Sequence, residues 1–178
     1  MAESAAPRGE VAALVAVQSA LADRRGALAT ARGLSHFGEH SIGWVVVAVL
    51  GAALAPRRRR DWLVAGAGAF AAHAAAVLVK RLVRRQRPHH PAVVVNVGTP
   101  SQLSFPSAHA TSTTAAAILM GRATGLPRGV GPVLLVPPMA LSRILLGVHY
   151  PSDVAFGIGL GAAVAGIARR AREAWPNE

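Results

Sequence analysis

Three separated stretches of the sequence carry ionisable residues whose types and spacing could do chemistry. In order, they are Lys80-x6-Arg87-Pro88, Pro106-Ser107-Ala108-His109 and Ser142-Arg143-x5-His149-x3-Asp153. Lys80 and Arg87 are two helical turns apart, so both can lie on one face if the helix continues that far. With Arg143 they supply three positive charges, which suit the charge that develops on phosphoryl oxygens during phosphoryl transfer.

The third stretch pairs an imidazole with a carboxylate. Pro151 favours the first turn of a helix, so Asp153 would lie in that turn and its carboxylate could reach back to His149. A carboxylate on one ring nitrogen fixes the tautomer and leaves the other nitrogen free to attack. Simple capping of the helix by Asp153 fits the same spacing.

The second stretch places a histidine at another predicted helix start. Pro106 and Ser107 precede a helical run, so the backbone N–H groups of residues 107–109 would point out of the helix as an anion site. A capping role for His109 is the alternative. Two histidines allow one ring to attack phosphorus and the other to protonate the leaving oxygen.

A metal-based alternative lacks ligands. Three Asp and five Glu occur in the chain, and only Asp153 lies within the three stretches, so a two-metal carboxylate site cannot be assembled there. The absence of cysteine excludes disulfides and Cys-ligated zinc. We therefore predict neither a metal nor a cofactor.

The composition indicates a membrane protein. Of the 178 residues 52% are hydrophobic, the mean hydropathy is +0.39, and short Arg-rich breaks separate the apolar runs. A net charge of +11 could indicate nucleic acid in a soluble protein. Here the arginines gather at the ends of apolar runs, as in residues 57–60, where they suit lipid headgroups. We predict contact with the bilayer and no nucleic-acid partner.

Five apolar segments could position these residues. They are 41–55, 62–79, 107–121, 130–148 and 153–168, and a further segment, 10–31, could lie in the membrane interface or span it weakly. We predict an all-α integral membrane bundle of five to six helices, with an N-terminal segment 1–40 and a membrane-embedded core 41–178. Threading the five segments brings the three stretches to one membrane face.

Taken in this order, the three stretches resemble the signature of the type 2 phosphatidic acid phosphatase family of membrane lipid phosphatases. The resemblance implies a metal-independent phosphatase in which His149 forms a phosphohistidine, Asp153 orients it and His109 protonates the leaving group. It also implies that the phosphate is bound by Lys80, Arg87, Ser107, Ala108 and Arg143. The family usually has glycine where this chain has Ala108, so contact there requires an ordinary backbone.

The substrate that the resemblance favours is a polyprenyl-linked phosphate. Compact actinobacterial members suggest decaprenylphosphoryl-5-phosphoribose in cell-wall synthesis; undecaprenyl diphosphate, phosphatidic acid and phosphatidylglycerol phosphate are alternatives. The alternative outside the enzymes is a basic membrane scaffold or a lipid-binding protein. Without the three presumed catalytic cations, six basic residues remain on the site's face against nine on the other. We therefore expect a bacterial plasma membrane protein with an extracytoplasmic site.

Several ionisable residues receive no catalytic role. We expect Arg81, Arg84 and Arg85 to be stop-transfer charges at a membrane boundary. His73 could face the site, but a contact between helices is the expected role. His89 and His90 are expected to be solvated loop residues, and His36 and His40 are left unassigned.

Overall fold

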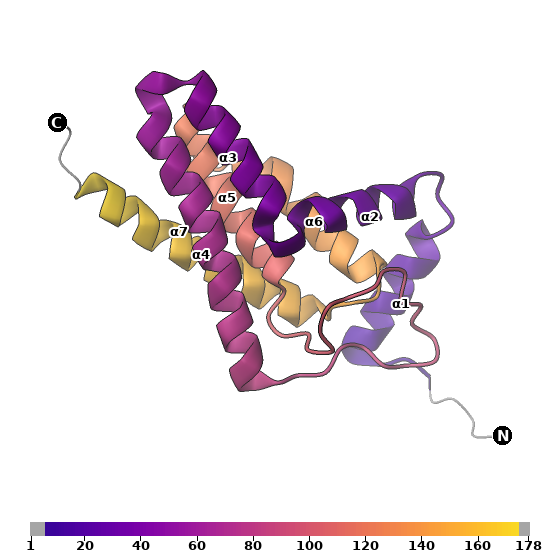
Figure 1. Cartoon of the computed structure of the whole chain (residues 1–178). Coiled ribbons are helices and arrows are strands. Elements are labelled where there is room, and N and C mark those ends of the chain that lie inside the picture. The colour runs from indigo at the N-terminus through magenta and orange to yellow at the C-terminus, as the bar shows by residue number, and fades with distance from the viewer. Residues whose placement is uncertain (1–5, 175–178) are drawn as a thin grey trace.

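Arg, Gly and Pro breaks between the apolar runs divide the chain into helices, which Figure 1 shows in a computed structural model. The structure describes residues 6–174, and within that range all the regular elements are helical. They are α1 Gly9–Leu21, α2 Ala27–Gly38, the 3-10 turn η1 Glu39–Ser41, α3 Ile42–Leu54, the 3-10 turn η2 Pro56–Arg58, α4 Arg59–Val83, α5 Ala108–Thr124, α6 Val130–Leu145 and α7 Pro151–Glu173. The predicted all-α class is confirmed, and α3 to α7 correspond to the five predicted segments.

The N-terminal segment forms two helices where the sequence suggested one. Gly26 has a φ of 81°, a left-handed conformation that glycine adopts freely, and it ends the polar turn between α1 and α2. With 13 residues, α1 is about 20 Å long, shorter than the roughly 30 Å hydrocarbon core. A second sharp bend at His40 and Ser41 turns α2 away from α3 (Figure 1).

Among residues 6–174, three stretches are long and apolar enough to cross a membrane: Ala27–Leu54, Pro56–Val83 and Pro151–Glu173. The central helix α5 is not among them, because it has only 17 residues and contains buried Ser and Thr residues. It packs against α3, α4, α6 and α7, which shield it from lipid. The hydroxyls of Thr111 and Thr114 donate to carbonyls one turn earlier, each at 2.8 Å, so their polar groups are satisfied inside the helix.

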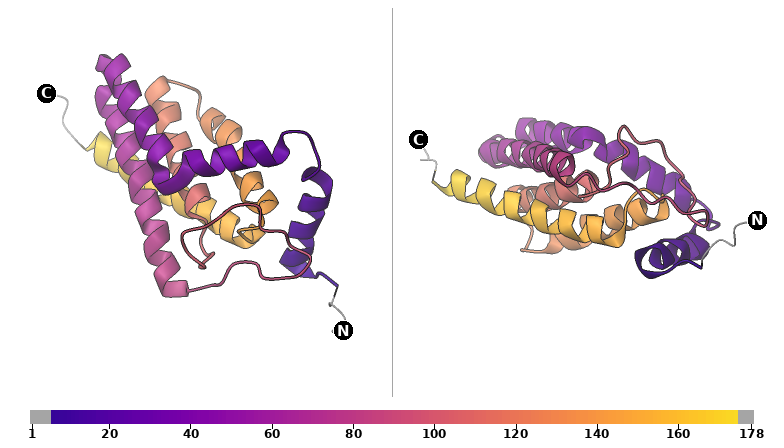
Figure 2. Two further views of the ribbon diagram at one scale, coloured as in Figure 1. Left: turned by 45° about the vertical axis from the view of Figure 1, so that its right-hand side comes forward. Right: turned by 90° about the horizontal axis from the view of Figure 1, so that it is seen from below.

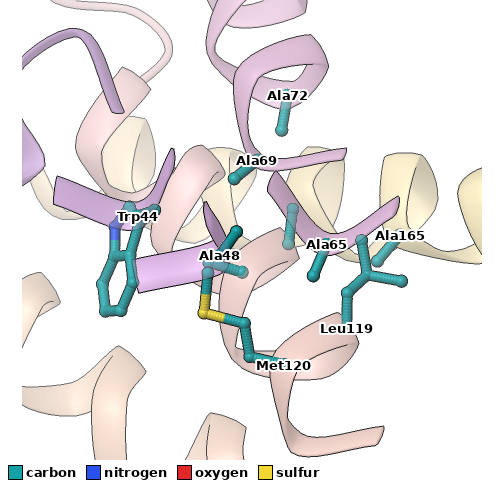
Figure 3. Packing of buried hydrophobic residues seen from close by; sticks show 10 residues of the cluster. Trp44, Ala48, Ala65, Ala69, Ala72, Leu119, Met120 and Ala165 are labelled. Carbon is teal, nitrogen blue, oxygen red and sulfur yellow. The ribbon is translucent and has the colours of Figure 1, made fainter. Parts of the chain in front are cut away.

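Small side chains allow the helices to pack closely around α5. Alanines of α4 and α5 meet Trp44, Leu119 and Met120 in the main apolar cluster (Figure 3). On α7, a Cβ at Gly161 would lie 2.3 Å from the carbonyl oxygen of Thr111, so this position requires glycine. Close approach between small residues is the usual way that helices associate in lipid. The protein is therefore an integral membrane helical bundle.

One end of this bundle gathers the three sequence stretches. The C-terminal end of α4, the long loop of residues 84–107 and the start of α7 lie at this end, while the α3–α4 and α5–α6 connections lie at the other (Figures 1 and 2). The loop is held in place by backbone hydrogen bonds from Ser104 N to Arg85 O at 2.7 Å and from Asn96 N to Leu146 O at 3.0 Å. This arrangement agrees with the threading expected from the five segments.

Candidate active site

A cavity of about 550 Å³ lies between α4, α5, η1 and the long loop. Six of the eight predicted site residues line it: Lys80, Arg87, Ala108, His109, Arg143 and His149. The other two, Ser107 and Asp153, are fully buried and do not line it. Residues from all three sequence stretches therefore surround one space.

Arg87 reaches His149 from the loop rather than from a helix. Arg84 adopts a left-handed conformation (φ 56°) that ends α4, so the helix does not continue to Arg87. Lys80 and Arg87 therefore do not share a helical face, as the sequence spacing had allowed. Two carbonyls hold the guanidinium: Nε donates to Ser101 O at 2.8 Å and Nη1 to Val148 O at 2.7 Å. The same Nη1 atom lies 3.3 Å from Nε2 of His149.

The other nitrogen of the His149 ring faces Asp153. The distance from Nδ1 to Oδ2 is 3.6 Å, slightly longer than a hydrogen bond. The carboxylate is itself held by the backbone N–H of Tyr150 at 2.8 Å and by Nη1 of Arg85 at 2.9 Å. Asp153 therefore caps α7 and also faces the His149 ring. Capping and contact with the imidazole, which the sequence offered as alternatives, both occur.

The protonation states of His149 and Arg87 suit attack by the imidazole on a bound anion. Burial lowers the pKa of His149 to about 3; Asp153 opposes this shift, and the cations of the cavity reinforce it. Burial also lowers the pKa of Arg87 to about 10, with Asp153 acting in the opposite direction. At neutral pH the imidazole is therefore neutral and the guanidinium is charged.

The remaining two cations lie deep in the bundle. Nζ of Lys80 donates to the carbonyls of Leu103 at 2.8 Å and Ser104 at 3.0 Å, which ties the loop to α4. Arg143 is only 2% exposed, and its Nη2 has no hydrogen-bond partner among residues 6–174. A buried charged donor without a partner is costly, and an anion in the cavity would relieve that cost.

The start of α5 supplies the third side of the site. Ser107 caps the helix, because its hydroxyl accepts from Ala110 N at 3.5 Å, and the backbone N–H groups at this end point out of the helix. Ala108 does not have a positive φ, so alanine fits where the family usually has glycine. Nε2 of His109 lies 2.9 Å from the carbonyl of Ser35, which can only accept, so Nδ1 is the nitrogen that can exchange a proton.

Sequence reasoning missed the contribution of α2 and η1. His36, Glu39 and His40 line the cavity, although nothing in their spacing indicated it. His73 also lines it, with its ring centroid 5.7 Å from that of His40, so the expected role as a helix contact describes only part of its position. The bend after α2 creates this wall, and one sequence gives little signal for such a bend.

The expectation that three arginines after Lys80 serve only as boundary charges is wrong for two of them. Arg81 lines the cavity, and Arg85 donates to the buried carboxylate of Asp153. Arg84 is exposed, in keeping with a boundary charge. The direction of each side chain depends on the end of α4 and on the fold of the long loop, which the charge pattern does not encode.

Comparisons with known proteins identify the family. The PAP2 superfamily profile matches residues 61–176. The chain is 80% identical over 162 residues to the decaprenylphosphoryl-5-phosphoribose phosphatase of Mycobacterium tuberculosis, covering 91% of this chain and 90% of that protein. It is 68% identical over 154 residues to the protein of the same name in Mycolicibacterium smegmatis, covering 86% and 84%.

A solved structure shares the fold. The transmembrane PAP2-type phosphatidylglycerolphosphate phosphatase of Bacillus subtilis superposes with a TM-score of 0.70 and 20% identity, covering 93% of this chain and 87% of that one. The helical membrane bundle predicted from the sequence is thereby confirmed. Since the family profile covers well over half of the chain and two curated relatives match most of it, the chain belongs to the PAP2 superfamily.

Proposed function

We propose that this protein hydrolyses the phosphate monoester of decaprenylphosphoryl-5-phosphoribose at the membrane surface, through a phosphohistidine. The observation that carries the proposal is the cavity in which the cations of Lys80, Arg87 and Arg143 meet the imidazoles of His109 and His149. The chemical class of the substrate follows the names of the relatives that are 80% and 68% identical. At 80% identity over 91% of the chain, a shared activity is the simplest inference.

The reaction begins with the phosphoryl group between the cations. Arg87, Lys80 and Arg143 bind its oxygens, and the N–H groups at the start of α5 add neutral donors. Nε2 of His149 attacks phosphorus while the bond from phosphorus to the sugar oxygen breaks. His109, which carries protons on both ring nitrogens when the phosphoryl dianion is bound, gives the proton of Nδ1 to that oxygen, and the dephosphorylated lipid leaves.

The second half of the reaction returns the enzyme to its starting state. His109, now neutral, takes a proton from a water molecule as that water attacks the phosphohistidine. The bond between phosphorus and Nε2 breaks, and inorganic phosphate leaves. Asp153 stabilises the positive ring through both halves, because its carboxylate is held against Nδ1.

A sugar-bearing lipid suits the shape and position of the cavity. At about 550 Å³ the space exceeds what a phosphoryl group needs, and its wall continues past His109 to His40 and His73, whose rings can bond hydroxyl groups. Exposed Leu78 and Leu82 on the outer face of α4 suit the lipid chain. Arg81 lines the cavity and could meet the phosphodiester that joins sugar and lipid.

Location and chain organisation follow as further parts of the proposal. The excess of arginine on the opposite face supports an extracytoplasmic site in a bacterial plasma membrane. Residues 1–40 form an N-terminal segment that completes a membrane-embedded core of residues 41–178. Within the described residues, the contact between Ser35 and His109 joins the two parts.

The test is phosphate release by the detergent-solubilised protein in the presence of EDTA. The substrate panel contains decaprenylphosphoryl-5-phosphoribose, undecaprenyl diphosphate, phosphatidic acid and phosphatidylglycerol phosphate. We expect turnover of the first to exceed that of the others, and His149→Ala to abolish it while His89→Ala does not. Preference for another lipid would overturn the substrate, and a His149→Ala variant that binds lipid and still turns over would overturn the mechanism.

A further inference from the structure

Arg85 connects the buried carboxylate of the active site to the N-terminal helix. Its Nη1 donates to Asp153 Oδ1 at 2.9 Å and to Ser152 Oγ at 2.7 Å, and its Nη2 donates to Glu10 Oε2 at 2.7 Å. The guanidinium also lies over the ring of Tyr150, 4.1 Å from the ring centroid. Both Nη atoms of the guanidinium thus donate to groups at the start of α7 or on α1.

Glu10 closes the network from the side of α1. While one of its oxygens binds Arg85, the other accepts the backbone N–H of Ser152 at 2.8 Å. Burial raises the pKa of Glu10, but the hydrogen bonds from Arg85 and Ser152 outweigh it, so its pKa is lowered and the carboxylate is ionised. At neutral pH Arg85 therefore joins the ionised carboxylate of Glu10 to the buried carboxylate of Asp153.

A second polar contact fixes α1 in the same position. The side chain of Gln18 donates to Val94 O at 2.6 Å and to Leu145 O at 3.0 Å, and it accepts from Val94 N at 3.1 Å. Between Glu10 and Gln18, Leu14 is fully buried against the bundle. The helix is thus anchored at both ends, to the start of α7 and to the long loop, although it lies outside the matched family region of residues 61–176.

We propose that Arg85 is a positioning residue that holds Asp153 against His149, and that Glu10 of α1 holds Arg85. This inference rests on the proposed phosphohistidine mechanism. Arg85 does not line the cavity, so it acts through Asp153 and not on the phosphate. The N-terminal helix thereby becomes part of the catalytic architecture.

The physical reason lies in how loosely the ring and carboxylate are joined. The separation of His149 Nδ1 and Asp153 Oδ2 is 3.6 Å, so this contact alone does not fix the carboxylate. Asp153 is fully buried, and a buried charge needs partners that satisfy both oxygens. Tyr150 N supplies one partner and Arg85 the other, and charge-assisted bonds from a guanidinium are strong and directional.

The test is a double-mutant cycle between Arg85→Gln and Asp153→Asn, measured as kcat and KM on the lipid phosphate that the unmodified protein turns over. We expect Arg85→Gln to lower kcat about tenfold or more, the range seen for outer-shell partners of histidine ligands, with KM changed little. In the Asp153→Asn background the same change should cost less than about twofold, because its target is gone. Arg84→Gln is the matched control, since Arg84 is an exposed neighbour of equal charge.

Two further variants keep the test decisive if Arg85→Gln fails to fold. Arg85→Lys keeps the charge but not the fork, and it should recover part of the lost kcat. Glu10→Gln should lower kcat about two- to fivefold, as expected for a partly exposed ion pair. Losses that multiply with that of Asp153→Asn, or variants as active as Arg84→Gln, would overturn the inference. Full activity of Asp153→Asn would instead contradict the proposed mechanism.

Discussion

Nη1 of Arg87 and Nε2 of His149 lie 3.3 Å apart, so the cation that would bind the phosphate touches the nitrogen that would attack it. The opposite nitrogen of the ring faces Asp153. The two sides of the imidazole thus face a guanidinium and a carboxylate. This arrangement sets the tautomer, because only Nδ1 has an acceptor of full negative charge.

Replacing Arg87 with lysine keeps the charge but removes the guanidinium that donates to Ser101 O and Val148 O and lies beside Nε2 of His149. A lysine ammonium cannot reproduce those planar contacts. We expect kcat/KM to fall at least tenfold in Arg87→Lys, measured by phosphate release. Arg57→Lys, at the opposite end of the bundle, is the control and should keep wild-type kinetics; similar values for the two variants would contradict the role of the fork.

Restoring the glycine that the family usually has at position 108 should change little. Ala108 does not need a positive φ, so Ala108→Gly should keep kcat within about threefold and cost at most about 1 kcal/mol of stability. Gly147→Ala provides the contrast, because this residue has a φ of 72° and a Cβ there would lie 2.4 Å from Val94 O. Thermal melting and phosphate release are measured on both variants. A tenfold loss of kcat in Ala108→Gly would contradict the expectation that glycine at position 108 changes little.

The sequence predicted which residues meet at the site better than it predicted the path of the chain around them. The motif residues carried enough spacing information to place Lys80, His109 and His149 around one space. The end of α4 at Arg84 was not predictable, because it depends on a left-handed residue that is not glycine. The role of Arg85 was missed because its partners, Glu10 and Asp153, are far away in sequence and meet only once α1 packs on α7.

His73 provides a test of the sugar in the proposed substrate. Its Nδ1 is buried without a hydrogen-bond partner among the described residues, and its ring lines the cavity near His40. We expect His73→Ala to raise KM about five- to tenfold for decaprenylphosphoryl-5-phosphoribose, since one lost hydrogen bond to a neutral group is worth about 1 kcal/mol. KM for phosphatidic acid, which has no sugar, should not change. Equal increases for both lipids would show that His73 does not contact the sugar.

The low pKa of His149 predicts how stability depends on pH. Burial lowers this pKa to about 3 in the folded protein, whereas an unfolded chain has a histidine pKa of about 6.5. Between these values the unfolded state binds a proton that the folded state does not, so the free energy of unfolding falls as the pH is lowered. Glu10, whose pKa is also lowered, acts in the same direction. His149→Asn removes only the contribution of His149, so melting temperatures in detergent at pH 7.5 and 5 should differ less in this variant than in the wild type. Equal differences in the two proteins would show that His149 is not held neutral by burial.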